Sequence, residues 1–343
     1  MGSTGSPGRR AALRFANYGL VYCSILLAGL LAACYALRSD WIAAVTVFPP
    51  WAWVVVGFGL PAFRLLSLGR RSAVLVTFVW LVFLLAFADH PAAMFRYSAW
   101  PAAQWAAARY EGRGVRVISL NCASSAAAAR EVAALQPDIV LLQESPDRPQ
   151  LEALARQLFG DEGQALYGVD ASLVARGPIE PRKLARNLAS YAVQARVRLA
   201  NGREVEVACL RLEYALVRID LWAPECWRAQ RANRRRRRDQ LAGVLRGTAL
   251  QGTGDAPTNV PVIVGGDFNA PPGDAIYRLL SPRFRDAFAS GGRGWGNTIV
   301  NNWLPFSRID QVWTSDAFVA TDVFSAPTLY SDHRMVVCDL VLK

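Results

Sequence analysis

Five short stretches in the C-terminal part of the chain place polar residues at the ends of predicted strands. The stretches are VISLN, VLLQE, VIVGGDFN, SRID and YSDHR, and their polar residues are Asn121, Glu144, Asp267, Asn269, Asp310, Asp332 and His333. A single polar residue at a strand end usually belongs to a turn. Five such ends, with four acids and one of the two histidines in the chain, indicate a shared site.

Carboxylates, amides and one imidazole are the groups that hydrolysis of a phosphate ester requires. Such esters resist attack because the anion repels a nucleophile and the leaving group is poor. A divalent cation such as Mg²⁺, held on carboxylate oxygens, offsets the developing charge and activates water. An Asp–His pair adds a group whose pKa can be tuned for proton transfer. We therefore interpret His333 as a candidate catalytic residue.

The five motifs LN, QE, GDFN, RID and SDHR, in this order, resemble those of the endonuclease/exonuclease/phosphatase superfamily. This superfamily covers type I DNases, abasic-site endonucleases, inositol-polyphosphate phosphatases and neutral sphingomyelinases. The resemblance spans about residues 114–343. It implies an α/β fold, a four-layer α/β sandwich of the DNase I type. It also implies a metal-dependent hydrolase of phosphate esters that uses Mg²⁺, with Mn²⁺ as an alternative.

The resemblance implies a metal-binding side of the site. Glu144 would be the principal ligand, with Asn121 and Asp332 around the same ion. Asp267 would orient or deprotonate the attacking water. These four residues would together generate the nucleophile.

The resemblance also implies a phosphate-binding side, where the sequence departs from the family pattern. Asn269 would hold a phosphate oxygen, and Asp310 would fix the tautomer of His333, which would contact the scissile phosphate. The family normally has a second histidine, in a strand element of the type NTHL. The matching strand here is VACLRLEY, and Arg211 occupies that position.

Arg211 leaves two interpretations open. A guanidinium is a permanent cation with a bidentate fork, so it can clamp a phosphate, but it cannot shuttle a proton at neutral pH. The domain is then either an active variant or a weakened, non-catalytic domain that binds phosphate. The remaining site residues are retained, which favours activity.

Strands and helices alternate around these motifs. Strands are predicted at 115–121, 138–144, 171–179, 190–213 with a hairpin around Asn201-Gly202, 260–269, 307–315, 318–326 and 333–342, and helices at 125–136, 149–160 and 237–247. A strand-rich chain with intervening helices is consistent with two sheets packed face to face and helices outside.

The N-terminal part differs in composition from the rest of the chain. Three apolar blocks lie at 17–37, 41–63 and 72–88, and the second contains three prolines, so it is expected to be kinked or re-entrant. Each block is long enough to cross a bilayer core of about 30 Å as a helix. We expect a membrane region with about three transmembrane helices at 1–95, a linker at 96–113 and the phosphoesterase-like domain at 114–343.

Arginines next to the apolar blocks predict a multi-pass orientation. The N-terminus carries Arg9, Arg10 and Arg14, and the loop between the second and third blocks carries Arg64, Arg70 and Arg71. Positively charged segments stay cytoplasmic. Three spans would therefore place the C-terminal domain outside the cytoplasm, whereas two spans would reverse it.

Seven arginines fall within residues 228–238, in a chain whose net charge is +11. This run is open to three interpretations: a solvated helix face, contact with a nucleic-acid backbone, or contact with anionic lipid headgroups. No aromatic residue interrupts its arginines, which argues against a site that stacks single-stranded bases. Trp295 and Trp303 would either line the mouth of the site or pack in the core.

The cysteines carry no metal-binding pattern. None has C-x-x-C spacing, and Cys209 and Cys226 would be either a local disulfide or buried free thiols.

The sequence is consistent with three functions. The favoured one is a membrane-anchored phosphoesterase whose substrate is a phospholipid or a lipid-linked phosphate. The alternatives are an extracytoplasmic nuclease and a non-catalytic phosphate-binding domain. The expected partners are the lipid bilayer and the phosphate-ester substrate, lipid-linked or nucleic acid, and no protein partner is predicted.

Overall fold

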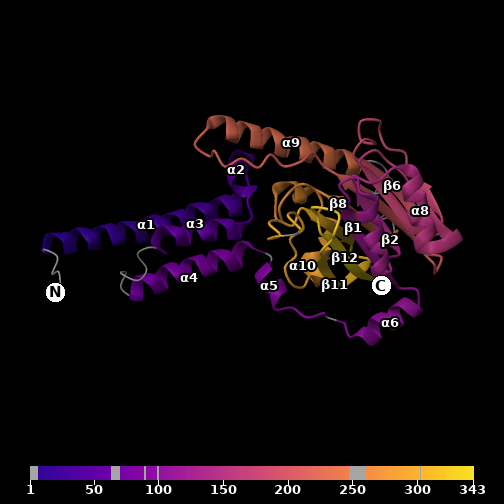
Figure 1. Cartoon of the computed structure of the whole chain (residues 1–343), viewed down its shortest axis with the longest axis horizontal. Helices are drawn as coiled ribbons and strands as arrows, with labels where there is room; N and C mark the ends of the chain where they lie inside the picture. Colours follow the sequence, from indigo (N-terminus) through magenta and orange to yellow (C-terminus); the bar gives the residue numbers. More distant parts are fainter. Residues whose placement is uncertain (1–6, 63–69, 89, 99, 247–259, 302) are drawn as a thin grey trace.

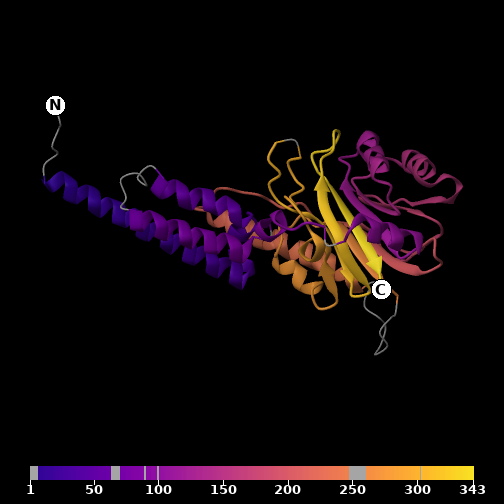
Figure 2. The same ribbon diagram turned by 90° about the horizontal axis from the view of Figure 1, so that it is seen from below.

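The computed structural model describes residues 7–62, 70–88, 90–98, 100–246, 260–301 and 303–343. Its long axis runs from a bundle of apolar helices near the N-terminus to a two-sheet sandwich that contains the C-terminus (Figure 1). The same two parts are seen after a quarter turn in Figure 2. The long helix α9 extends from the sandwich to the bundle.

Two mixed six-stranded sheets form the sandwich. The first has the order β11-β12-β1-β2-β4-β3 and comprises β1 (Gly114–Asn121), β2 (Ile139–Gln143), β3 (Gly163–Leu166), β4 (Ala171–Arg176), β11 (Phe318–Ala326) and β12 (Met335–Leu342). The second has the order β5-β6-β7-β8-β10-β9 and comprises β5 (Ile179–Pro181), β6 (Ala192–Arg198), β7 (Glu204–Arg211), β8 (Val262–Asp267), β9 (Phe284–Asp286) and β10 (Asp310–Ser315).

Helices cover the outer faces of both sheets. The helices α7 (Ala126–Glu131) and α8 (Arg148–Phe159) pack on the first sheet, and α9 (Pro224–Arg246) and η4 (Ala275–Leu279) pack on the second. A third apolar cluster lies between the sheets and includes Val117, Leu141 and Val207. The central strands are buried on both faces, which explains why they are continuous apolar runs rather than alternating ones. The prediction of an α/β fold of the DNase I type is confirmed.

Several local predictions are also confirmed. The strands β6 and β7 form an antiparallel hairpin around Asn201-Gly202, where Gly202 has φ +79°. The helix expected at 125–136 is α7 followed by a 3₁₀ turn, η2 (Val132–Leu135). The Ser125 hydroxyl caps it by accepting from the Ala128 amide. Cys209 and Cys226 are buried free thiols, so the disulfide alternative is wrong.

Three helices form the bundle: α1 (Pro7–Leu37), α3 (Pro50–Ala62) and α4 (Arg70–Phe87). At its centre the Ser24 hydroxyl donates to the Gly57 carbonyl at 3.0 Å and accepts from the Trp80 indole at 2.9 Å. Gly57 permits this contact, because a Cβ there would lie 1.8 Å from the Trp80 ring.

The expected number of spanning helices is not reproduced. Among the described residues one helix, Phe15–Leu37, is long and apolar enough to cross a membrane. The number of candidate spans rises to two if a bent pair of helices is counted as a single span. That pair is Asp40–Thr46 with Pro50–Gly59, bent by 66°. The bend follows Pro49 and Pro50, which lack the amide needed to continue a helix. The third apolar block is a shorter helix, Arg71–Phe87.

The short elements between these helices lie at the sandwich end of the bundle. They are η1 (Asp40–Ile42) and α2 (Ala43–Thr46). Farther along, α5 (His90–Met94) and α6 (Ala102–Tyr110) lead into β1, and α10 (Ala287–Gly291) packs against β11. The N-terminal end of α1, the part of the helix whose sequence includes Arg9, Arg10 and Arg14, lies at the opposite end of the bundle from the sandwich, and Arg64 lies outside the described residues.

The arginine run is a structural connection rather than a free cationic face. All seven arginines have a partner within the chain: Arg228 with Glu225, Arg231 with the Trp41 ring, Arg234 with Asp274, Arg235 and Arg238 with Asp40, Arg236 with Glu213, and Arg237 with the Asn269 carbonyl. Arg234 and Arg237 are each only 1% exposed. Because α9 packs on both the sandwich and η1–α2, the arginines around its whole circumference meet protein as well as solvent.

Candidate active site

One edge of the sandwich collects the predicted residues because of the strand directions. The strands β1 and β2 are parallel, as are β7 and β8, so Asn121, Glu144, Arg211 and Asp267 follow or end four strands at the same edge. Neighbouring antiparallel strands start at that edge. One of them is β10, in which Asp310 pairs with Asp267. Strands of both sheets therefore place their polar residues at the same edge of the sandwich.

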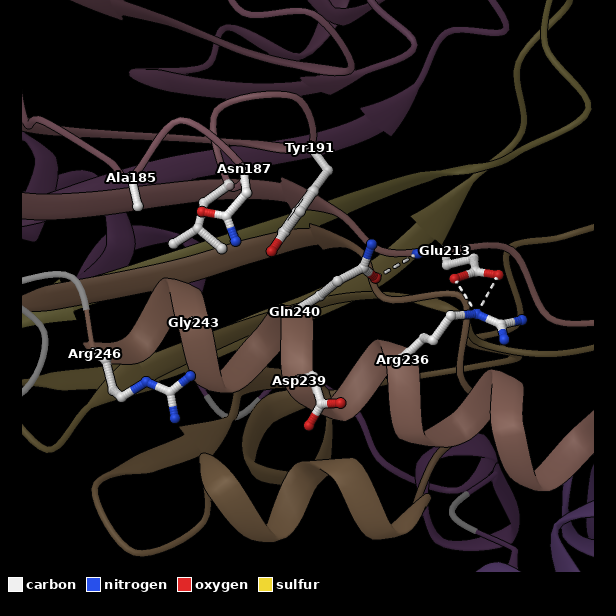
Figure 3. Close-up of a pocket in the computed structure, with 10 residues that line it drawn as sticks. Ala185, Asn187, Tyr191, Glu213, Arg236, Asp239, Gln240, Gly243 and Arg246 are labelled. Carbon is white, nitrogen blue, oxygen red and sulfur yellow. Dashed lines mark hydrogen bonds and ion pairs between the residues drawn. The ribbon is translucent and has the colours of Figure 1, made fainter.

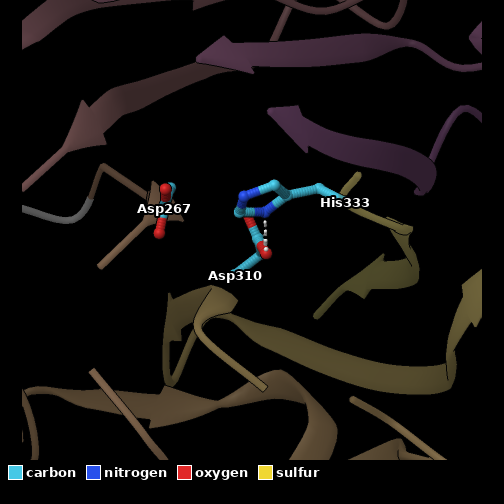
Figure 4. A group of neighbouring side chains, drawn as sticks. All are labelled: Asp267, Asp310 and His333. Carbon is cyan, nitrogen blue, oxygen red and sulfur yellow. Dashed lines mark hydrogen bonds and ion pairs between the residues drawn. The ribbon is translucent and has the colours of Figure 1, made fainter. Parts of the chain in front are cut away.

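Three buried side chains, which we call the inner half of the site, lie at the centre of this edge (Figure 4). They are Asp267, Asp310 and His333, with exposed fractions of 1%, 0% and 6%. The His333 Nδ1 lies 2.8 Å from Asp310 Oδ2. One ligand atom from each residue lies within 4.8 Å of the others. The expected Asp310–His333 pair is therefore present in the geometry.

Burial and mutual charge perturb the inner half strongly. Burial disfavours the protonated imidazole, but the charge and hydrogen bond of Asp310 outweigh it, and the pKa of His333 is raised to about 10. Burial and the Asp310 charge raise the pKa of Asp267 to about 7, against the opposing effect of His333. The imidazole therefore favours its charged form, and Asp267 can accept a proton near neutral pH.

Two asparagines hold Asp267 in place. The Asn269 amide donates to Asp267 Oδ1 at 2.9 Å, and its side-chain Nδ2 donates to Oδ2 at 3.1 Å. The Asn121 Nδ2 group donates to Asp267 Oδ2 at 3.2 Å and to Glu144 Oε1 at 3.0 Å. Asn121 thus connects the inner half to Glu144.

A more exposed group, which we call the outer half, consists of Glu144, Arg211 and Asp170. Arg211 Nη2 lies 2.7 Å from Glu144 Oε1, and Nη1 lies 3.7 Å from Asp170 Oδ2. The three side chains are 32%, 26% and 41% exposed, in the order Glu144, Arg211, Asp170. Arg211 occupies the position of the missing histidine, and its guanidinium is bonded to the residue predicted to be the principal metal ligand.

Asp332 is placed differently from the other predicted residues. It is exposed, and its backbone carbonyl accepts from the Asn301 amide at 2.9 Å. Its charge contributes to the raised pKa of His333, so the carboxylate lies near the inner half. Of the two tryptophans, Trp295 packs against Trp51 with ring centroids 6.0 Å apart, and Trp303 is 90% exposed.

The residues present fit a divalent cation. Asp310 Oδ1 is buried and has no hydrogen-bond partner among the described residues. A buried carboxylate oxygen without a partner is costly unless a cation or proton compensates it. The Asn121 Nδ2 group stands between the carboxylates of Glu144 and Asp267, where a positive partner is needed. Carboxylate and amide groups supply the hard oxygen ligands that such cations prefer.

The backbone at the site is held in an unusual conformation. Glu144 and Asn269 have φ values of +42° and +50°, as do few non-glycine residues. Residues held in this region cluster at functional sites, where the surrounding structure maintains them. Here the Asn269 carbonyl accepts a hydrogen bond from the buried Arg237 of α9.

Reasoning from the sequence missed two residues near the site, Asp170 and Arg237. Asp170 immediately precedes β4, and β4 runs antiparallel to β2. The start of β4 therefore lies at the same sheet edge as the end of β2, and this position was the signal that could have identified Asp170. In the sequence, Arg237 is one of the seven arginines of the run at 228–238, with nothing that links it to the site. Its contact with the GDFN motif depends on how α9 packs, which residue spacing does not reveal.

A groove of about 660 Å³ lies beside α9 but not over this chemistry (Figure 3). Its lining includes Tyr191, Arg236 and Arg246, and Arg236 is bonded to Glu213 at 2.7 Å. None of the predicted site residues lines it. We therefore locate the active site at the strand ends.

The chain belongs to the endonuclease/exonuclease/phosphatase family, whose sequence model matches residues 118–333, well over half of the chain. Members of this family are hydrolases that act on phosphate esters, and dependence on a divalent metal is typical of them. The protein is accordingly a hydrolase of phosphate ester bonds. No curated protein sequence matches the chain.

Solved structures share the fold at low sequence identity. A family member from Bacteroides vulgatus is 17% identical with a TM-score of 0.51, and the match covers 67% of this chain and 99% of that one. A protein of unknown function from Enterococcus faecalis is 12% identical with a TM-score of 0.50, covering 66% of this chain and all of the other. Both likenesses concern the fold alone.

Proposed function

We propose that the protein is a membrane-anchored, Mg²⁺-dependent phosphoesterase that hydrolyses a phospholipid or a lipid-linked phosphate. The catalytic part of this proposal is supported by the buried Asp267–Asp310–His333 cluster. A non-catalytic phosphate-binding domain would have no need to retain a buried Asp–His pair beside a second carboxylate, since burying such groups is costly.

Glu144, Asn121 and Asp332 would hold the metal ion. When bound, it would supply Lewis-acid stabilisation of the phosphate and lower the pKa of a water. Asp267 orients the attacking water and accepts its proton, a role for which a pKa of about 7 is suited. Mn²⁺, which also accepts oxygen ligands, is the alternative metal.

Three residues bind the phosphate, and Asp310 supports one of them. His333, kept protonated by Asp310, donates a hydrogen bond to a phosphate oxygen and offsets the charge that develops as the ester bond breaks. The side chain of Asn269 holds another oxygen by exchanging one of its two present bonds, to Asp267 Oδ2 or to the Leu212 carbonyl, for the phosphate. Arg211 exchanges its ion pair with Glu144 for the phosphate when substrate binds, as a bidentate clamp.

The membrane anchor is supported by the surface of the bundle. Exposed large apolar side chains occur on α1 (Tyr18, Tyr22, Leu26, Leu30, Leu37), on α3 (Val55, Val56) and on α4 (Val74, Leu75, Phe78, Leu81, Val82, Leu85). Soluble proteins rarely expose an apolar surface of this extent. A bilayer would cover it, with α1 as the spanning helix.

The lipid substrate is supported by the short distance between the strand ends of the site and the bundle. Four residues before Asp310, the Phe306 carbonyl accepts from the Trp51 indole of α3 at 3.2 Å. Four residues after Asn269, Gly273 lies against the Arg38 guanidinium at the end of α1. Four residues span at most about 14 Å, so both strand ends lie close to the bundle. A bilayer around the bundle would therefore bring lipid headgroups to the site.

The chain then divides into a membrane region at 1–95, a linker at 96–113 and the phosphoesterase domain at 114–343. The N-terminal end of α1, whose sequence includes the N-terminal arginines, lies at the end of the bundle away from the sandwich. Since positive segments stay cytoplasmic, the phosphoesterase domain is extracytoplasmic. A reporter fused after Lys343 that scored as cytoplasmic would contradict this orientation.

A substrate panel tests the proposed activity. The full chain is purified in detergent, reconstituted in nanodiscs and assayed with Mg²⁺ against phospholipids, polyprenyl pyrophosphate and plasmid DNA. We expect release of phosphate or headgroup from lipid, and its loss in the His333→Ala variant. Nicking of plasmid without lipid turnover would reject the lipid substrate in favour of a nuclease. No turnover of any substrate, with no difference for Glu144→Ala, would support the non-catalytic alternative.

A further inference from the structure

Three tryptophans remain exposed in the described part of the chain: Trp41, Trp222 and Trp303, at 67%, 83% and 90%. They come from three distant segments of the sequence. Trp41 belongs to η1, and the other two precede residues that pack against the bundle helices, Trp227 and Phe306. Single exposed apolar side chains are ordinary, whereas a larger exposed apolar surface marks contact with a partner or a membrane.

The segment 214–222 connects β7, which carries Arg211, to the start of α9. It exposes Val217, Ile219 and Trp222 at 56%, 79% and 83%. The carbonyl of Leu221 accepts from the Trp227 indole at 2.8 Å, and Trp227 packs against the buried residues of the bundle. The exposed side chains of this segment are therefore held beside the apolar helices, where α9 begins in Figure 1.

Trp303 and Leu304 are 90% and 50% exposed. They come a few residues after Ile299, which forms a bridge with His333. Phe306 then contacts Trp51 of the bundle, with ring centroids 5.2 Å apart. The two exposed side chains are therefore within three residues of a contact with the bundle.

We propose that Trp41, Val217, Ile219, Trp222, Trp303 and Leu304 form a lipid-contacting rim that seats the sandwich on the bilayer surface. The inference rests on the membrane anchor proposed above and adds that the catalytic domain itself touches lipid. Tryptophan suits this position because its apolar ring and indole N–H match the boundary between acyl chains and headgroups.

The charges near the rim fit anionic lipid headgroups. Arg228 and Arg235, on α9, have side chains that are 74% and 53% exposed, although each also pairs with a carboxylate of the chain, Glu225 and Asp40 respectively. Arg231 covers the Trp41 ring at 3.4 Å, which places another cation at the rim. Arginines near an anionic bilayer surface are attracted to it. The rim therefore combines apolar side chains with nearby positive charge, and its partner is a bilayer that contains anionic lipid.

Spin labels test the depth of the rim directly. Cys23 and Cys34 are replaced by serine, and single cysteines are introduced in the full chain at Trp222, Trp303, Leu26 and Glu152. Leu26 is an exposed apolar residue of α1, and Glu152 is an exposed residue of α8 on the outer layer of the sandwich. Each variant is reconstituted in nanodiscs of phosphatidylcholine and phosphatidylglycerol. Accessibility to oxygen and to a water-soluble nickel complex is then measured.

We expect labels at positions 26, 222 and 303 to favour oxygen and the label at 152 to favour the nickel complex. Labels at 222 and 303 that match position 152, while 26 favours oxygen, would overturn the rim and leave the anchor intact. A nickel-accessible label at 26 would overturn both. No turnover is measured, so absence of phosphoesterase activity would not affect this result.

A second measurement links the rim to catalysis. The paired variant Trp222→Ser with Trp303→Ser is compared with Tyr110→Ser, which removes a 95% exposed aromatic side chain of α6. Turnover of a bilayer-embedded phosphate ester is divided by turnover of a short water-soluble one. We expect this ratio to fall on the order of tenfold in the paired variant, the effect of about 1.4 kcal/mol, and to stay constant in Tyr110→Ser. An unchanged ratio in the paired variant would contradict delivery of substrate from the bilayer through the rim.

Discussion

The inner and outer halves of the site contain the same kinds of group in different surroundings. In the inner half, Asp310 and His333 are almost fully buried and joined at 2.8 Å. In the outer half, Glu144 and Arg211 are joined at 2.7 Å but remain about a third and a quarter exposed. Water screens the outer pair and competes with it, whereas little competes with the inner pair.

This difference separates two tasks. A buried pair is fixed before substrate arrives, so it suits proton transfer and charge stabilisation. A partly exposed pair can open at low cost, so it suits the admission of a cation and a phosphate. We infer that the inner half is preorganised and that the outer half is rearranged by ligands.

The largest effect is expected from the inner half. In Asp310→Asn the amide no longer supplies the negative charge that keeps His333 protonated, so kcat should fall by about 10²–10⁴-fold, the usual contribution of such a group. Steady-state kinetics at saturating Mg²⁺ measure this. Asp316→Asn, which changes an exposed aspartate at the other end of β10, should keep full activity. More than a tenth of wild-type activity in Asp310→Asn would show that the inner pair is not catalytic.

The next effect concerns Glu144 and the metal. Chelation with EDTA should abolish activity, and Mg²⁺ should restore it. In Glu144→Gln the metal affinity should fall by about 10–100-fold, by analogy with the loss of supporting groups at metal sites. Isothermal titration with Mg²⁺ measures the affinity independently of turnover. Glu213→Gln is the matched control, because Glu213 is also paired with an arginine and lies two residues from Arg211. Equal Mg²⁺ affinities of the Glu144→Gln and Glu213→Gln variants would show that Glu144 is not a metal ligand.

A smaller effect is expected for Arg211. In Arg211→Met the KM should rise about tenfold, as expected from losing one charge-assisted contact. The metal affinity should rise, since Arg211 no longer competes for Glu144. Arg211→Lys keeps the charge without the fork and should recover part of the KM loss. A lower metal affinity in Arg211→Met would mean that the guanidinium supports the ion rather than exchanging with it.

The smallest effect comes from a Glu–Arg cluster outside the site. Glu206 is bonded to Arg182 and Arg196, each at 2.7 Å, in the β6–β7 hairpin. Burial would raise the pKa of Glu206, but these two hydrogen bonds outweigh it and lower the pKa. Glu206→Gln should cost about 1–2 kcal/mol of unfolding free energy and leave turnover unchanged.

The sign of the pH dependence follows from that lowered pKa. The stabilisation by Glu206 is fully present above the pKa of the unfolded chain, about 4.3. It is lost as the pH falls through the lower folded value. Urea unfolding of wild type and Glu206→Gln at pH 7 and pH 3 measures it. The difference between the proteins should shrink at pH 3, and a constant difference would show that the ion pairs contribute nothing.

Much of the sandwich was predictable because its signals are local. Apolar runs with turn residues between them define the strands, and Asn201-Gly202 defines a hairpin without reference to the rest of the chain. The number of membrane spans was predicted incorrectly. Hydropathy counted the block at 41–63 as one span, whereas Pro49 and Pro50 divide it into two helices with different directions.

The arginine run shows the limit of local signals most clearly. Seven charges in eleven positions predict exposure, yet Arg234 and Arg237 are buried. Their partners are Asp274, the Asn269 carbonyl and residues of the bundle, and all of these are distant in sequence. A buried cation is tolerated only where such partners converge, so its burial cannot be read from its neighbours along the chain.

The sequence by itself determined the types of catalytic residue, their order and the family to which the chain belongs. Residue identity sets what chemistry is available, and strand patterning sets which residues reach the sheet edge. Only the tertiary structure decided that His333 pairs with Asp310, that Arg211 bonds to Glu144, and that strand ends near the site lie close to the bundle. These outcomes depend on contacts between residues far apart in the chain, whose free energies arise only when the two sheets, α9 and the bundle pack together.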